Sequence, residues 1–137
     1  MGLKIDRALL GQEFDRVVLG PVTAEEIIEF AAATEEIAVP ASAADLVAPP
    51  TFVIRARGDL FKPPKLGRIQ LGFDAGKDIE FGVPIRPGDV LTSVATVRDI
   101  YEKTGRSGSM SFMVLRTVVT NQRDELVAVV DQRMMYR

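Results

Sequence analysis

Residues 109–120 read SMSFMVLRTVVT, and this stretch decides how the second half of the chain folds. Its apolar residues form two alternating sets, Met110, Phe112, Val114 and Val118 in one and Met113, Leu115 and Val119 in the other. Because successive side chains of a strand point to opposite faces of a sheet, the pattern predicts a strand that is apolar on both faces. We expect one face to pack on a helix, and we interpret the other as a surface that a partner subunit covers.

Three further strands are predicted around this one. They are Lys77–Val83, Asp89–Lys103 and Glu125–Tyr136. Turn-forming residues separate the strands. The turn Gly105-Arg106-Ser107-Gly108 is interpreted as a hairpin, since it lacks the lysine and the strand–helix setting of a phosphate-binding loop. The second half is therefore predicted to be a four-stranded antiparallel meander.

The first half of the chain predicts one short strand and one helix. Val17-Val18-Leu19 is an apolar run closed by Gly20-Pro21, which is typical of a strand that ends in a turn. Thr23 and Glu26 have the spacing of a capping box. The apolar residues that follow recur at helical spacing, so a helix is expected from here to about Thr34.

A second, shorter helix is predicted after the proline pair Pro49-Pro50. Thr51 is expected to cap it, and it should run from Phe52 to about Arg57, because prolines at 63 and 64 prevent it from extending further. Residues 41–46 have the composition of one additional helical turn.

Composition limits the organisation and the location of the protein. The length of 137 residues predicts one domain over residues 1–137. The formal net charge of −2 predicts no general attraction to nucleic acid. No apolar run approaches the roughly 18 residues that a membrane-spanning helix needs, and the Met1 end lacks the core of a signal peptide. The cytoplasm is therefore the expected location.

Two residue types that carry much of enzyme chemistry are missing. The sequence contains no cysteine, which excludes disulfides, thiolate nucleophiles and cysteine-ligated metals. It also contains no histidine, which excludes histidine-dependent catalytic triads and histidine-ligated metal sites. Any acid/base catalysis by this chain alone would need a carboxylate, lysine or tyrosine with a shifted pKa.

Several motifs resemble one enzyme family. Residues 46–52, LVAPPTF, resemble the (I/V)APPTF signature of MaoC-like enoyl-thioester hydratases and dehydratases. Residues 79–91, IEFGVPIRPGDVL, resemble the same family's E-F-x-x-P-(I/L)-R-x-G-D-x-L pattern, and the likeness continues at 97–103 and 125–128. The resemblance covers about residues 15–136. It implies the hot-dog fold of the α+β class, an antiparallel sheet curled around a helix, and this helix is expected to be short here because Arg55, Arg57 and nearby prolines disfavour a long buried one.

The resemblance departs from the family pattern at the catalytic residues. In active members a run like Y-A-x-x-(S/T)-G-D-x-N-P-(I/L)-H supplies an Asp and a His that act on a water molecule. The corresponding run here is residues 30–41, with Glu36 near the Asp position and Ala41 or Ser42 at the His position. The resemblance therefore implies an N-terminal-type, non-catalytic subunit that needs a histidine-bearing hot-dog partner. It implies an acyl-CoA or acyl carrier protein thioester as substrate, with no metal or redox cofactor.

The candidate substrate-binding residues fall into two groups. The first group, expected to line a pocket, is Ala48, Pro49, Pro50, Thr51 and Phe52. The second group is Arg55, Arg57, Lys62 and Lys65, which form either an electropositive rim for coenzyme A phosphates or an acidic carrier protein, or a solvated loop.

Two other functions stay open at this point. Glu35 and Glu36 could act as a substitute acid/base pair in a self-sufficient, homodimeric hot-dog hydratase or thioesterase, although an acidic helix end is the commoner role for such a pair. Alternatively, the chain could be a non-enzymatic module, forming a homodimer in isolation, that captures an acyl-CoA.

Overall fold

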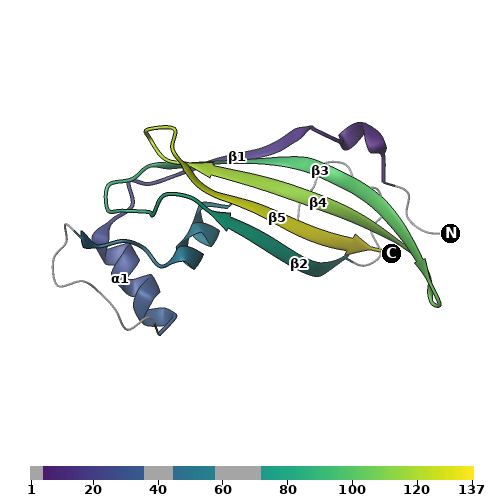
Figure 1. Cartoon of the computed structure of the whole chain (residues 1–137), viewed down its shortest axis with the longest axis horizontal. Coiled ribbons are helices and arrows are strands. Elements are labelled where there is room, and N and C mark those ends of the chain that lie inside the picture. Colours follow the sequence, from purple (N-terminus) through teal and green to yellow (C-terminus); the bar gives the residue numbers. More distant parts are fainter. Residues whose placement is uncertain (1–4, 36–44, 58–71) are drawn as a thin grey trace.

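The structure is a computed structural model, and it describes residues 5–35, 45–57 and 72–137. Its main feature is a curved five-stranded antiparallel sheet (Figure 1). The elements in chain order are η1 (Arg7–Leu9), β1 (Glu13–Leu19), α1 (Ala24–Ala33), η3 (Pro50–Ala56), β2 (Gly72–Phe81), β3 (Leu91–Gly105), β4 (Gly108–Thr120) and β5 (Leu126–Tyr136). The strands are ordered β1-β3-β4-β5-β2. This arrangement confirms the predicted antiparallel α+β class.

The sheet topology corrects one prediction. β3, β4 and β5 form the expected meander, but β2 pairs with β5 and not with β3, whose other neighbour is β1. Residues 82–90 between β2 and β3 are too long for a tight hairpin and include Pro84 and Pro87, which have no N–H for strand pairing. This segment instead crosses the end of the sheet, and that crossing helps to form the candidate site.

Side chains on β4 alternate as the sequence predicts. Met113, Leu115 and Val119 are fully buried on what we call the inner face, the face that carries the core. Phe112 on the opposite, outer face is half-buried, and its ring stacks on Tyr101 of β3 at 4.9 Å between centroids. Cover of the outer face by a partner subunit stays a prediction.

Local sequence signals determine where α1 and η3 begin. The capping box at the start of α1 is confirmed, because Thr23 Oγ1 accepts the Glu26 N–H at 3.1 Å and Glu26 Oε2 accepts the Thr23 N–H at 3.2 Å. η3 is a short 3₁₀ helix, and the prediction that Thr51 caps it is wrong. Pro49 occupies the cap position and Pro50 the first turn, where a fixed φ and a missing N–H suit a helix start.

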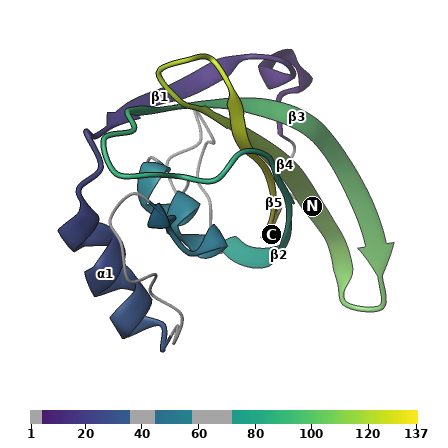
Figure 2. The same ribbon diagram turned by 60° about the vertical axis from the view of Figure 1, so that its left-hand side comes forward.

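α1 and η3 lie on the same side of the sheet at one end. In both views η3 lies between α1 and the sheet, within the curve of the strands (Figure 2). Ile27 of α1 and Phe52 and Val53 of η3 share one core cluster with the inner-face residues Val119 and Val130. The expected sheet curled around a shortened helix is thus confirmed. The predicted helical turn at 41–46 falls largely outside the described residues.

None of the helices in the described ranges is both long and apolar enough to cross a membrane.

Candidate functional site

A cavity of about 290 Å³ lies where η3 meets the end of the sheet. It is lined by Val47–Pro50, Val53, Phe81–Ile85 and Val127. Among the described residues its lining therefore consists of apolar side chains and backbone. The volume of this cavity is near the lower end of the range for ligand sites, and it can hold an apolar group. None of the described residues that line it has a side chain able to act as an acid or base.

Backbone hydrogen bonds hold the segments of the cavity wall together. The Ala48 N–H donates to Ile85 O at 2.8 Å, which joins the segment before η3 to the segment after β2. The Gly82 N–H donates to Val127 O at 2.8 Å, which joins the latter segment to β5. A Cβ at Gly82 would lie 2.0 Å from Leu126 O, so this close approach requires glycine.

Asp89 fixes the far end of this wall. Its side chain is buried and accepts the Arg86 N–H at 2.8 Å and the Gln122 Nε2–H at 2.9 Å. Gln122 in turn accepts the Val90 N–H at 2.9 Å. Asp89 was not among the predicted site residues, although the P-I-R-P-G-D motif contains it. Its role in the structure is to hold residues 82–90 in place.

The structure brings three of the predicted pocket residues together and leaves two outside the cavity. Ala48, Pro49 and Pro50 line it. Thr51 is exposed, and Phe52 is fully buried in the core, where its ring contacts Phe30 edge-on at 5.3 Å between centroids.

The structure describes two of the four residues of the predicted basic rim, and these two differ in exposure. Arg55 is exposed, and its guanidinium lies 5.4 Å from the centre of the Phe52 ring. Arg57 is half-buried, and burial lowers the pKa of its guanidinium while the charge of Asp74 opposes that change. Lys62 and Lys65 lie outside the described residues.

The candidate catalytic pair is described only in part. Glu35 is exposed, directly after the last turn of α1, with a left-handed φ of 58°. Glu36 lies outside the described residues. Within the three described ranges, no group of three or more acidic side chains is placed to hold a metal ion.

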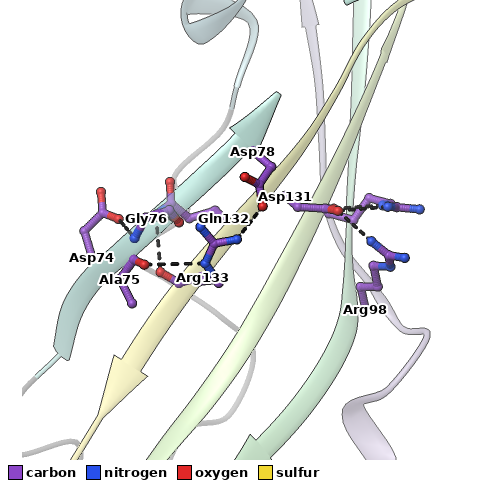
Figure 3. A network of polar contacts seen from close by, with 9 residues as sticks. Asp74, Ala75, Gly76, Asp78, Arg98, Asp131, Gln132 and Arg133 are labelled. Atoms are coloured by element: carbon purple, nitrogen blue, oxygen red, sulfur yellow. Dashed lines mark hydrogen bonds and ion pairs between the residues drawn. The ribbon is translucent and has the colours of Figure 1, made fainter. Parts of the chain in front are cut away.

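Two polar networks cross the strands of the sheet (Figure 3). On β2, a bulge between Asp74 and Lys77 is closed by Asp74 Oδ1, which accepts the Gly76 N–H at 2.8 Å and the Gln132 Nε2–H at 2.6 Å. The hydrogen bond from Gly76 is the main reason that the pKa of Asp74 is lowered. On the outer face, Asp131 of β5 accepts hydrogen bonds from Arg98 and Arg116, which ties β3, β4 and β5 together.

Comparisons with known proteins find similarity to dehydratases and hydratases. Residues 8–130 match the family described as "FAS1-like, dehydratase domain region". A chain of the C-terminally truncated HadBC (3R-hydroxyacyl-ACP dehydratase) complex from Mycobacterium tuberculosis is 29% identical, with a TM-score of 0.68, over 97% of this chain and 99% of that one. The (R)-hydratase from A. caviae involved in PHA biosynthesis is 20% identical, with a TM-score of 0.68, over 91% and 94%.

A third solved structure has the same fold. It is the ChsH1-ChsH2 complex from Mycobacterium tuberculosis, with 16% identity and a TM-score of 0.68 over 90% of this chain and 83% of that one. The search of curated proteins finds no match to this sequence.

Proposed function

Since this chain belongs to the FAS1-like dehydratase domain family and has the hot-dog fold of MaoC-like hydratases, we propose that it is an acyl-thioester-binding, non-catalytic subunit. The assembly would be an (R)-specific enoyl-thioester hydratase or 3-hydroxyacyl dehydratase, acting on a CoA or acyl carrier protein thioester. This chain would bind part of the acyl group, and a histidine-bearing hot-dog partner would supply the Asp and His that act on water.

One observation carries the proposal. The whole sequence lacks histidine, yet it retains the motif segments around Pro49-Pro50 and Pro84–Asp89 that build the apolar cavity. General acid/base catalysis typically contributes about 10²–10⁴ in rate, so a chain without the base should bind the acyl group but hydrate it poorly. Retention of a binding cavity alongside loss of the base is what a division of labour between two subunits requires.

The β2 edge of the sheet supports the proposal of a partner subunit. β2 pairs with β5 and with no other strand among the described residues, so one of its backbone edges is available to a strand of another chain. Phe73 and Phe81 at the two ends of β2 are 40% and 52% exposed, so each end of this edge presents an aromatic side chain that a partner could cover. The HadBC relative is a complex, as its name states.

The first experiment separates the three functions that the sequence allows. Hydration of crotonyl-CoA is measured with the purified chain alone and with a histidine-bearing hot-dog partner co-expressed. We expect turnover only with the partner. Turnover by the chain alone that is lost in Glu35→Gln or Glu36→Gln would instead establish a self-sufficient carboxylate enzyme. Tight binding of long-chain acyl-CoA by the lone chain, with an inactive pair, would establish a binding module.

A second experiment tests the cavity itself. Val53 lines it, whereas the neighbouring Ile54 on η3 is 45% exposed, so Val53→Phe and Ile54→Phe form a matched pair. Val53→Phe should raise the KM of the pair for a medium-chain enoyl thioester about tenfold or more, the effect of obstructing one or two methylene groups in an apolar pocket. Ile54→Phe should leave the KM unchanged. Equal effects of the two variants would remove the cavity from the acyl site.

A further inference from the structure

Arg57, at the end of η3, carries two buried hydrogen-bond donors that are unused. Its Nε and Nη2 atoms are both inaccessible to solvent, and neither has a hydrogen-bond partner in the part of the chain that the structure describes. A buried donor without an acceptor is destabilising, and a charged one more so. Groups of this kind are rare in folded proteins, so this one calls for an acceptor that the described residues lack.

The two unused donors are the pair that forms one side of the guanidinium. Nε–H and the adjacent Nη2–H point in nearly the same direction from a rigid plane. This geometry matches the two oxygens of a carboxylate, which accept both hydrogen bonds at once. A lysine at the same position would keep the charge but could not reproduce this paired contact.

Among the described residues, two cations, Arg57 and Lys77, act on the single carboxylate of Asp74. Asp74 is the acidic group whose charge acts on Arg57, but its Oδ1 already accepts hydrogen bonds from Gly76 and Gln132. Its Oδ2 lies 4.0 Å from Lys77 Nζ. Two cations therefore share one carboxylate among the described groups. A single additional negative charge would balance them, which favours a carboxylate over a doubly charged phosphate.

A second unused donor lies on the adjacent strand. The side chain of Tyr136 is buried, and its hydroxyl has no hydrogen-bond partner within the described ranges. Tyr136 pairs with Gly72, which shares a face of β2 with Asp74 because the two are two residues apart. Burial raises the pKa of Tyr136 to about 12, so the hydroxyl stays protonated and able to donate at neutral pH.

We propose that Arg57 is the anchor of a carboxylate-binding site on the inner face at the β2 edge of the sheet, with its Nε and Nη2 each donating to one carboxylate oxygen. The carboxylate belongs either to a small organic acid or acyl group, or to an Asp or Glu side chain of a second protein chain. The site is separate from the apolar cavity, whose lining among described residues does not include Arg57. The proposal does not depend on the hydratase function.

The test follows the Arg57 Nε–H directly. In ¹H–¹⁵N spectra of the full chain, the Arg57 Nε–H resonance is assigned by its loss in Arg57→Lys, and the exposed Arg55 serves as an internal control. Hexanoate and its neutral analogue hexanamide are titrated separately. We expect hexanoate to shift the Arg57 resonance and to bind at least about tenfold more tightly than hexanamide, the advantage of charge-assisted bonds over neutral ones. Arg57→Lys should abolish this preference.

Sedimentation of the same samples distinguishes the two sources of the carboxylate. Hexanoate binding with an unchanged molecular mass supports a small-molecule ligand, whereas binding that dissociates an assembly supports a carboxylate from a second chain. Equal binding of hexanoate and hexanamide would overturn the proposal, as would a preference for inorganic phosphate. An Arg57 resonance that responds to Asp74→Asn but not to hexanoate would also overturn it, because the guanidinium would then simply pair with Asp74.

Discussion

Replacing Asp89 with asparagine should destabilise the protein by about 2–3 kcal/mol. The buried carboxylate accepts two hydrogen bonds, from the Arg86 N–H at 2.8 Å and from Gln122 Nε2 at 2.9 Å. Asparagine has the same shape but only one acceptor oxygen, so one of these donors would face an NH₂ group. A hydrogen bond to a charged group contributes about 1.5–3 kcal/mol, and a buried donor left unsatisfied costs about 1–3 kcal/mol. These two figures describe overlapping effects and are not added.

Urea unfolding measures this change, with Asp124→Asn as the matched control. Asp124 is an exposed turn residue with a φ of 57°, which asparagine adopts readily, so its variant should stay within about 0.5 kcal/mol of the wild type. Asp89→Asn should lower the midpoint without changing the slope, because the area exposed on unfolding is the same. Equal midpoints for the two variants would refute the role assigned to Asp89.

Two further predictions concern stability. Gly82→Ala should lower the free energy of unfolding in urea by about 2 kcal/mol or more, because the new Cβ would lie 2.0 Å from Leu126 O. Gly105→Ala is the control, since its Cβ would have its nearest contact at 3.7 Å, and it should lower the free energy of unfolding much less. A similar decrease in both variants would exclude the steric cause. Hydrogen bonds and charge from Arg116, aided by Arg98, lower the pKa of Asp131 below its unfolded value of about 3.9. Its contribution to stability is therefore complete above that value and lost as the pH falls through the lower folded pKa, so Asp131→Asn should flatten the fall in melting temperature below about pH 4. An unchanged acid profile would contradict this assignment.

Much of the fold could be predicted because its signals are local. Thr23 and Glu26 are three residues apart, so the capping box depends on no distant part of the chain. Alternation along residues 109–120 identified both faces of β4, because the period of a strand is fixed by its backbone. The pairing of β2 with β5 could not be obtained in this way, since it depends on how residues 82–90 cross the sheet.

The candidate site likewise combines features that local sequence predicts with features that depend on the packing of distant segments. Of the five motif residues expected to line a pocket, Ala48–Pro50 line the cavity and Thr51 and Phe52 do not, and substrate binding by these residues stays a prediction. Arg57, by contrast, was grouped with Arg55, Lys62 and Lys65 because all four are cations close together in sequence. Charge spacing alone does not indicate which guanidinium is buried, and that depends on the packing of η3 against the sheet.

The segment 82–90 links three parts of the chain that are distant in sequence. Besides its bonds to Ala48 and β5, it exchanges hydrogen bonds with Val22, which donates to Asp89 O at 2.8 Å and accepts the Gly88 N–H at 2.7 Å. Val22 directly precedes the capping box of α1. A ligand that displaced this segment would break the hydrogen bonds of the Val22 and Ala48 amides together. Hydrogen exchange at these two amides should therefore rise together whenever a ligand in the cavity moves residues 82–90, which couples the cavity to the residue that precedes the α1 cap.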